Sequence, residues 1–520
     1  MKSVKTIICA AVAAFGLTAC NDYLDIMPEN ALPQEEMWAS KSDVESALFA
    51  GYYNLRSSIT THLIPLGELR AGCVKRYNGN SLDKFDIKPT DGTITEWKIF
   101  YKIIADANGV IANAEKTRSN DETYTEEEMN SHLCEAYFLR ALSYFYIVRN
   151  WRDAPLVLEP YDTDEAEYLL PQSSEAELIA QIKKDLKTAI KLGAAKEEFD
   201  TTWETKGRAT IWAIYALMAD VCLWNQDFDE AIQYADLVVE SQSPYAPRFM
   251  STATHSSWFK MFNPGNSEES IFEIQYSSIK YDGTSFQTNN LPTLFYNTTP
   301  TTYMLSENLT REFNSDATQI FNRFNGDQEM YVRTRFGGYY APENSVTGFV
   351  WKYLGGSTIS EPRTQNYYDP NYIIYRVAEV MLIKAEALLM RGMGQVPADN
   401  EQAIAIINTI RQRTNLLDVT ATANSSLVEL LELVISERIM EFVGEGKAWY
   451  DLLRVGRYVD PAGDINFIQT FFIPKVVHYN ETAGENKIKS TLMDKNAWYL
   501  PVNEAEIQRN PNLVQNKYYE

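Results

Sequence analysis

Three glutamates with helical spacing form the most conspicuous acidic group in the sequence, at Glu437, Glu441 and Glu445. Residues four apart lie on one face of a helix. Glycoside hydrolysis needs two carboxyl groups that face each other across a cleft, about 5–9.5 Å apart. Here all three side chains project the same way from one helix. Basic residues lie close by in the sequence, so we expect ion pairs between packed helices. These are Arg411, Arg413, Arg438, Lys447 and Arg454.

Other catalytic or metal-binding patterns are missing from the sequence. It has no G-x-S-x-G elbow, P-loop or dinucleotide fingerprint. The histidines are scattered, and none has a second His or Cys at the spacing of a zinc site. We therefore predict no catalytic residue, no bound metal and no cofactor, although scattered backbone oxygens could still hold a cation. An enzyme with the glutamate group above stays open as an alternative.

Aromatic residues gather in one irregular segment, residues 245–370. They make up 24 of its 126 residues, about 19%, against 12% in the whole chain. Loops held by a rigid scaffold often carry binding residues, and flat rings can stack on the C–H faces of sugars. Most of these rings should pack the segment's own core. Candidate ligand contacts in its loops are Tyr281, Phe286, Tyr296, Tyr339, Tyr340, Trp351 and Tyr367.

The first twenty residues resemble a lipoprotein signal. Lys2 and Lys5 precede a short apolar run, which ends in Leu-Thr-Ala before Cys20. The run is too short to span a bilayer as a mature helix, so we expect cleavage after residue 19 and lipidation of Cys20. An ordinary signal peptide that happens to contain a cysteine is the alternative.

The charge of the chain argues against nucleic-acid binding. Removal of residues 1–19 takes away two lysines and no acids, so the mature charge is 45 − 70 = −25. Nucleic-acid affinity depends on basic residues that neutralise phosphates. We expect the acidic surface to provide solubility, with no nucleic-acid partner.

A helical repeat pattern appears in residues 207–241. Ala219, Ala231 and Ala235 stand 12 and 4 residues apart, and Phe228 lies three residues before Ala231. This spacing is typical of a tetratricopeptide (TPR) unit, because small residues let two antiparallel helices approach closely.

Three further helix pairs are predicted from apolar residues at helical spacing. They pair residues 371–391 with 399–413, residues 131–149 with 174–192, and more weakly residues 42–56 with 95–117. A single pair cannot bury its apolar face, but stacked pairs share one core. The expected fold is therefore all-α, a TPR-like helical-pair solenoid with a large irregular, loop-rich insertion.

Several short motifs, in order along the chain, resemble those of the RagB/SusD family of outer-membrane nutrient-binding lipoproteins. They are NDYLDI at 21–26, EAYFLRAL at 135–142, GRAT at 207–210, RVAE at 376–379, KAEA at 384–387, EGKAWYDLLR at 445–454, YLPV at 499–502 and NPNLVQN at 510–516. The resemblance runs nearly end to end. These motifs are mostly structural, so they point to the fold more strongly than to the ligand.

The resemblance implies a domain plan and a role. Signal residues 1–19 would precede an N-terminal TPR-like region (20–244), the insertion as ligand face (245–370) and a C-terminal helical region (371–520) that completes the solenoid. The protein would sit in the outer membrane through its lipid anchor, facing the exterior. It would capture an oligosaccharide or polysaccharide for a SusC-like TonB-dependent transporter, without catalysis.

Composition and loop placement give three more ligand candidates, Arg70, Tyr77 and Asn78, and other functions stay open. The resemblance implies that their polar segment lies beside the ligand face. Peptide import, as in the RagB branch, is one alternative function. A lipid-anchored surface glycoside hydrolase is a second, and a scaffold whose TPR groove binds segments of partner proteins is a third.

Overall fold

The computed structural model describes residues 37–160, 167–251, 260–280, 286–287, 291–295, 302–313, 350–355, 369–414 and 416–520. Cys20 lies outside these residues. Within them, no helix combines the length and the apolar character that a membrane crossing requires. The described chain is mostly helical, which confirms the predicted fold class.

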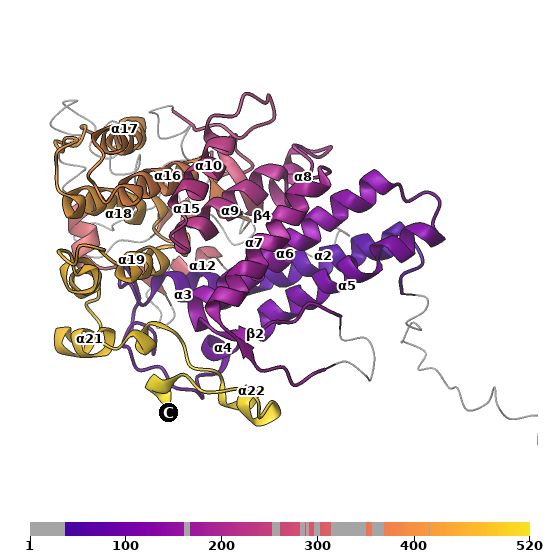
Figure 1. Ribbon diagram of the computed structural model, residues 1–520, viewed down its shortest axis with the longest axis horizontal. Helices are drawn as coiled ribbons and strands as arrows, with labels where there is room; N and C mark the ends of the chain where they lie inside the picture. Colours follow the sequence, from indigo (N-terminus) through magenta and orange to yellow (C-terminus); the bar gives the residue numbers. More distant parts are fainter. Residues whose placement is uncertain are drawn as a thin grey trace, which may run out of the picture.

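The main helices form one continuous row (Figure 1). Each helix packs on the next one along the row. In order they are α2 (Lys41–Ser58), α5 (Lys98–Asn120), α6 (Glu126–Trp151), α7 (Glu175–Leu192), α9 (Ile211–Trp224), α10 (Phe228–Val239), α16 (Val377–Arg391), α17 (Pro397–Arg413) and α18 (Leu427–Phe442). The four predicted helix pairs are therefore confirmed, and α10 contacts α16 directly across the insertion.

Local sequence signals set the limits of these helices. Thr125 and Glu128 form a capping box at the start of α6, and Ser174 and Glu177 form one at the start of α7. Helix α7 ends at Gly193, whose φ of 66° suits a residue without a Cβ. Ala219, Ala231 and Ala235, the small residues at the contact between α9 and α10, are fully buried, as their spacing predicted.

Within the described residues, four two-stranded antiparallel sheets interrupt the helices, and the sequence did not predict them. Their pairs are β1 (Val74–Arg76) with β7 (Tyr303–Leu305), β2 (Ala154–Pro155) with β3 (Gln172–Ser173), β4 (Ser270–Ile274) with β8 (Tyr372–Arg376), and β5 (Ser277–Lys280) with β6 (Phe286–Gln287). Strand β8 corrects the predicted start of the helix at 371. Its residues YIIYR are β-branched or aromatic apart from the last, and all five are buried against β4.

Shorter helices complete the fold around this row. They are α3 (Ile64–Glu68), α4 (Gly92–Thr95), α8 (Thr202–Gly207), α12 (Leu291–Phe295), α15 (Trp351–Leu354), α19 (Ala448–Arg457), α20 (Ile473–Tyr479), α21 (Glu485–Leu492) and α22 (Glu504–Arg509). Helix α19 packs on α3, so the C-terminal region closes onto the N-terminal one. The boundaries predicted at residues 244 and 370 stay predictions.

Candidate ligand-binding face

The glutamate group forms buried ion pairs, as the sequence predicted. The prediction of a single helix is wrong for Glu445, because α18 ends at Phe442 and Glu445 lies in the loop after it. Arg376 Nη1 donates to Glu441 Oε1 at 2.6 Å, and Arg376 Nε donates to Glu445 Oε2 at 3.1 Å. Arg413 also binds Glu441, and Glu437 lies 3.5 Å from an arginine nitrogen. Burial would raise the pKa of Glu441, but the charges of Arg413 and Arg376 outweigh burial and lower it to about 2. The three glutamates are therefore structural residues, each paired with a buried or partly buried arginine.

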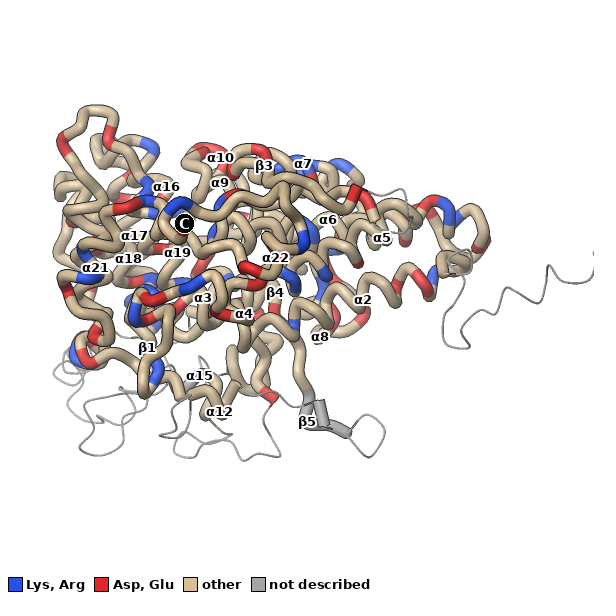
Figure 2. The backbone as a smooth tube through the Cα atoms, turned by 90° about the horizontal axis from the view of Figure 1, so that it is seen from below, with Lys and Arg blue, Asp and Glu red and all other residues tan. Residues whose placement is uncertain are grey.

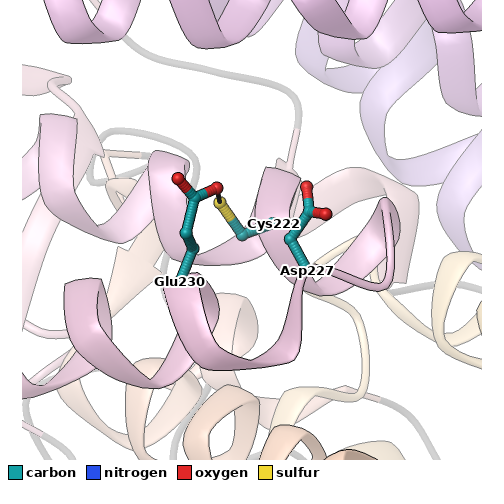
Figure 3. Close-up of side chains that lie close together, drawn as sticks. All are labelled: Cys222, Asp227 and Glu230. Carbon is teal, nitrogen blue, oxygen red and sulfur yellow. Dashed lines mark hydrogen bonds between the residues drawn. The ribbon is translucent and has the colours of Figure 1, made fainter.

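A second cluster of possible ligand atoms lies between α9 and α10 (Figure 3). The donor atoms of Cys222, Asp227 and Glu230 all lie within 4.8 Å of one another. Lys183 occupies the cation's place, because its Nζ lies 2.7 Å from Asp227 Oδ2 and also binds Glu230. Burial raises the pKa of the Cys222 thiol to about 12, so the thiolate that a metal needs is disfavoured. The cluster is better explained as a salt bridge than as a metal site.

The β1–β7 sheet joins the two segments that carry the predicted ligand contacts. It pairs Val74 with Leu305 and Arg76 with Tyr303, so the loop after α3 is hydrogen-bonded to the insertion. The backbone N–H of Tyr77 extends this link, donating to the carbonyl of Thr302 at 3.0 Å. Figure 2 shows β1, α12 and α15 along the same side of the molecule. We take this side as the candidate ligand face.

A tight turn presents Tyr77 and Asn78 at the end of β1. The N–H of Gly79 donates to the carbonyl of Arg76 at 3.0 Å, and Gly79 has a φ of 68°. Both central residues of this turn are exposed, and Tyr77 has 52% of its surface accessible. Both residues are accessible, as a ligand contact requires.

Asp83 fixes the loop behind this turn. Its carboxylate accepts hydrogen bonds from the backbone N–H groups of Asn80 at 2.6 Å and Arg76 at 3.3 Å. Its own carbonyl accepts from Asn480 at 2.9 Å. Burial raises the pKa of Asp83, although these hydrogen bonds oppose the shift. The turn is thus held before any ligand arrives, which lowers the ordering cost of binding.

Arg70 does not belong to this face, which corrects the prediction. Its side chain is fully buried. Nη1 donates to the carbonyl of Trp498 at 2.8 Å, Nη2 donates to Asn150 at 3.2 Å, and the guanidinium lies 4.3 Å from the ring centre of Trp449. Burial lowers its pKa to about 10. A ligand cannot reach this group, because it joins the C-terminal region to the core.

Stacked rings fix the described part of the insertion to the solenoid. Phe295 of α12 stacks on Tyr353 of α15 with ring centres 5.4 Å apart, and Tyr353 stacks on Tyr372 of β8 at 6.4 Å. Tyr303 of β7 meets Phe295 edge-on at 5.9 Å. These four rings are buried. They serve as core, as expected for most aromatics of this segment.

A buried lysine anchors the helix that begins with Trp351. Lys352 Nζ donates to the carbonyl of Glu441 at 2.7 Å and to Glu445 Oε1 at 2.5 Å. Burial lowers the pKa of Lys352, and the charge of Glu445 opposes that shift. These contacts therefore fix α15 at Lys352, the residue next to the candidate Trp351. Lys352 and Asp83 are positioning residues that the sequence analysis missed, because no local pattern identifies their partners.

The remaining candidates are not placed in detail. Tyr281, Tyr296, Tyr339, Tyr340 and Tyr367 lie outside the described residues, and for Phe286 and Trp351 only the backbone is described, in β6 and α15. They stay predictions.

One buried carboxyl should make stability depend on pH. Glu68 Oε1 accepts hydrogen bonds from the N–H groups of Gly446 at 2.7 Å and Lys447 at 3.3 Å, but burial raises its pKa to about 8. Between pH of about 4.5 and 8, the folded chain therefore holds a proton that the unfolded chain releases. The free energy of unfolding should fall as pH rises through this window.

Glu68→Gln should flatten that fall, which urea midpoints measured from pH 5 to 9 will show. Some slope should persist up to about pH 7, because burial also raises the pKa of Glu273 to about 7. Glu127→Gln, at an exposed position in α6, is the control. The same slope in Glu68→Gln as in the parent protein would contradict the prediction.

The fold and the candidate face together define a class of protein. It has a TPR-like helical scaffold and one long insertion, which pairs with the strand before the exposed Tyr77 turn. Two family models match the chain. The model described as "SusD family" matches residues 274–519, and the one described as "Starch-binding associating with outer membrane" matches residues 22–223. The chain belongs to the SusD/RagB family.

Individual relatives agree with this assignment. A SusD-like protein of Formosa agariphila is 24% identical over 493 residues, which cover 86% of this chain and 91% of that one. A SusD-like protein of Bacteroides ovatus is 26% identical over 493 residues, covering 88% and 83%.

Solved structures share the fold. A SusD superfamily protein of Bacteroides thetaiotaomicron has a TM-score of 0.70 at 21% identity and covers 93% of this chain and 99% of its own. A structure described as a laminarin-binding SusD-like protein has a TM-score of 0.66 at 19% identity and covers 92% and 99%.

Proposed function

We propose that this chain captures a glycan at the cell surface and delivers it to a SusC-like TonB-dependent transporter, without catalysis. Acylated Cys20 would hold it in the outer membrane, facing the exterior. Two similarities support a glycan ligand: the family model described as starch-binding, and the neighbour described as laminarin-binding. The family consists of binding proteins rather than enzymes in general, and the buried ion pairs of Glu441 and Glu445 agree with that role.

The observation that carries this proposal is the β1–β7 sheet. It joins the strand that precedes an accessible tyrosine and asparagine to strand β7 within the aromatic-rich insertion. An exposed ring offers a flat surface for the C–H face of a sugar, and an amide offers both a donor and an acceptor to its hydroxyls. A few such contacts provide roughly −4 to −8 kcal/mol, which corresponds to millimolar to micromolar affinity.

Tyr77→Ala should weaken glycan binding about tenfold, a loss of roughly 1.4 kcal/mol. Its melting temperature should stay unchanged, because the side chain is half exposed and has no hydrogen-bond partner among the described residues. Affinity gels and calorimetry with laminarin, soluble starch, other polysaccharides and peptides will measure the change. Tyr168→Ala is the matched control, because Tyr168 is 51% exposed and lies outside the insertion.

Two outcomes of this experiment would argue against the proposal. Unchanged binding by both Tyr77→Ala and Trp351→Ala would remove the face from the ligand site. Binding of peptides but of no polysaccharide would favour the peptide-import alternative. Product analysis after incubation with the bound polysaccharide tests hydrolysis separately.

A further inference from the structure

A pocket of about 220 Å³ opens between α2, α8 and the end of β4. Both views place these elements next to one another, and Figure 2 places the group well apart from β1 along the molecule. The residues that form it are Phe49, Tyr52, Tyr53, Arg56, Trp203, Glu204, Gly207, Arg208, Ile274 and Gln275. It is therefore separate from the turn that carries Tyr77.

Three exposed rings line this pocket. Phe49 is 47% exposed, Tyr53 is 59% exposed and Trp203 is 56% exposed. Trp203 stands out among the eight tryptophans whose side chains are described, since the other seven are buried. Large aromatic side chains gathered at a surface hollow often mark a binding site.

A rigid hydrogen-bonded wall lies behind the rings. The Tyr52 hydroxyl donates to Glu135 Oε2 at 2.7 Å and accepts from the N–H of Ala209 at 2.9 Å. Arg208 makes a two-pronged bond to the same carboxylate, at 3.0 and 2.6 Å. The guanidinium of Arg56 lies 5.0 Å from the ring centre of Tyr53. These contacts hold the pocket in shape without a ligand.

The polar groups at the rim exclude a purely apolar occupant. The indole N–H of Trp203 and the hydroxyl of Tyr53 make no hydrogen bond to any described residue. An apolar helix or acyl chain would bury these donors without partners, which costs about 1–3 kcal/mol for each. The occupant must offer flat C–H surface and hydroxyl groups at the same time, and a sugar ring offers both.

Charge and size narrow the class of ligand further. Arg208 is neutralised by Glu135, and Glu204 on the rim balances Arg56, so the pocket has no net charge. Its volume is below the roughly 300–1,000 Å³ of sites that enclose a drug-sized ligand. The pocket therefore suits one or two rings of a neutral glycan rather than a long segment.

We propose that this pocket is a second glycan-binding site, which holds a neutral sugar unit of a chain that also contacts the Tyr77 face. The inference rests on the proposed function, since it assumes a glycan ligand. A polymer that contacts both sites on the protein binds more tightly than one that contacts either site alone, because the second contact is intramolecular once the first has formed. Loss of this pocket should therefore affect long chains more than short ones.

Fluorine NMR on the full mature protein labelled with 5-fluorotryptophan will test the site directly. The Trp203 resonance is assigned by its loss in Trp203→Phe, and the probes are laminarin, soluble starch and short oligosaccharides of each. We expect the Trp203 resonance to shift on addition of the glycan that binds. Trp203→Ala should weaken polymer binding about tenfold and short-chain binding about twofold to threefold, with an unchanged melting temperature. Tyr168→Ala, which removes a ring that is 51% exposed outside the insertion, is the control.

The outcomes separate the two proposals. If Tyr77→Ala weakens binding while the Trp203 resonance stays fixed at saturation, the second site is wrong and the first stands. If the Trp203 resonance shifts but Trp203→Ala binds the polymer as the parent does, the second site is also wrong. If no neutral polysaccharide in a wider panel binds, both proposals fail.

Discussion

Arg376→Met is expected to lower the free energy of unfolding by about 3–5 kcal/mol, because it leaves buried carboxylates without their cation. Arg376 contacts three of them, with Nη1 at 3.1 Å from Glu269, Nη1 at 2.6 Å from Glu441 and Nε at 3.1 Å from Glu445. All four side chains have 1% or less of their surface exposed. Methionine keeps much of the volume and removes the charge, so the loss reports mainly on electrostatics.

Urea midpoints of the parent and the variant will measure this loss. Arg118→Met is the matched control, since Arg118 pairs with Glu115 at 2.7 Å on the surface of α5 and its loss should leave the midpoint unchanged. Adding Glu441→Gln to Arg376→Met should restore part of the stability by removing one unpaired charge. Equal midpoints for Arg376→Met and Arg118→Met would contradict the network described above.

The same residues separate a binding protein from an enzyme. Glu441→Gln should bind glycan as the parent does once it is folded, because Glu441 is buried in the network. Glycan turnover that the parent shows and a folded Glu441→Gln lacks would instead support the glycoside hydrolase alternative.

Gly67→Ala is expected to destabilise the fold severely or prevent folding. A Cβ at Gly67 would stand 2.0 Å from the carbonyl oxygen of Gly446 and 2.3 Å from its carbonyl carbon. The clash is with backbone, so rotation of a side chain cannot relieve it. Inside a helix, alanine normally gives about 1 kcal/mol more stability than glycine. A large loss of stability in Gly67→Ala would therefore reflect the close approach of α3 to the loop after α18.

Gly92→Ala is the control for this experiment. Gly92 begins α4, and its Cβ would have no neighbouring atom within 4 Å. We expect Gly92→Ala to yield soluble protein with the parent's melting temperature, and Gly67→Ala to yield little folded protein or a clearly lower melting temperature. Equal melting temperatures for both variants would show that α3 and the loop can separate at little cost.

The helical scaffold could be predicted from the sequence because its signals are local and repeated. Ala219, Ala231 and Ala235 mark a close helix contact by their size and spacing alone, and apolar residues at helical spacing mark the other helices. The glutamates of α18 were also assigned correctly to ion pairs, because their common helix face and nearby basic residues left few other arrangements.

The ligand face could be predicted only in part, because its geometry depends on contacts between distant segments. Strands β1 and β7 have three residues each and lie more than two hundred residues apart, so neither shows an alternating pattern long enough to recognise. Arg70 was misassigned for a related reason. Its segment is polar and looks exposed, but its partners Asn150 and Trp498 come from other parts of the chain. Tyr77, from the same segment, is exposed as predicted.

The direct packing of α10 on α16 bears on how this protein can diversify. The chain leaves the solenoid after α10 and returns to it through β8. Strand β4, which pairs with β8, lies in the first part of the segment between them. The contact between α10 and α16 closes the scaffold across this gap, and Glu269, Lys352 and Tyr353 join parts of the intervening segment to it. Changes between the two strands that spare buried residues such as Phe295, Lys352 and Tyr353 can therefore accumulate while the helical register stays intact. Surface changes in this segment therefore carry little penalty in folding, so relatives with the same helical frame need not bind the same ligand.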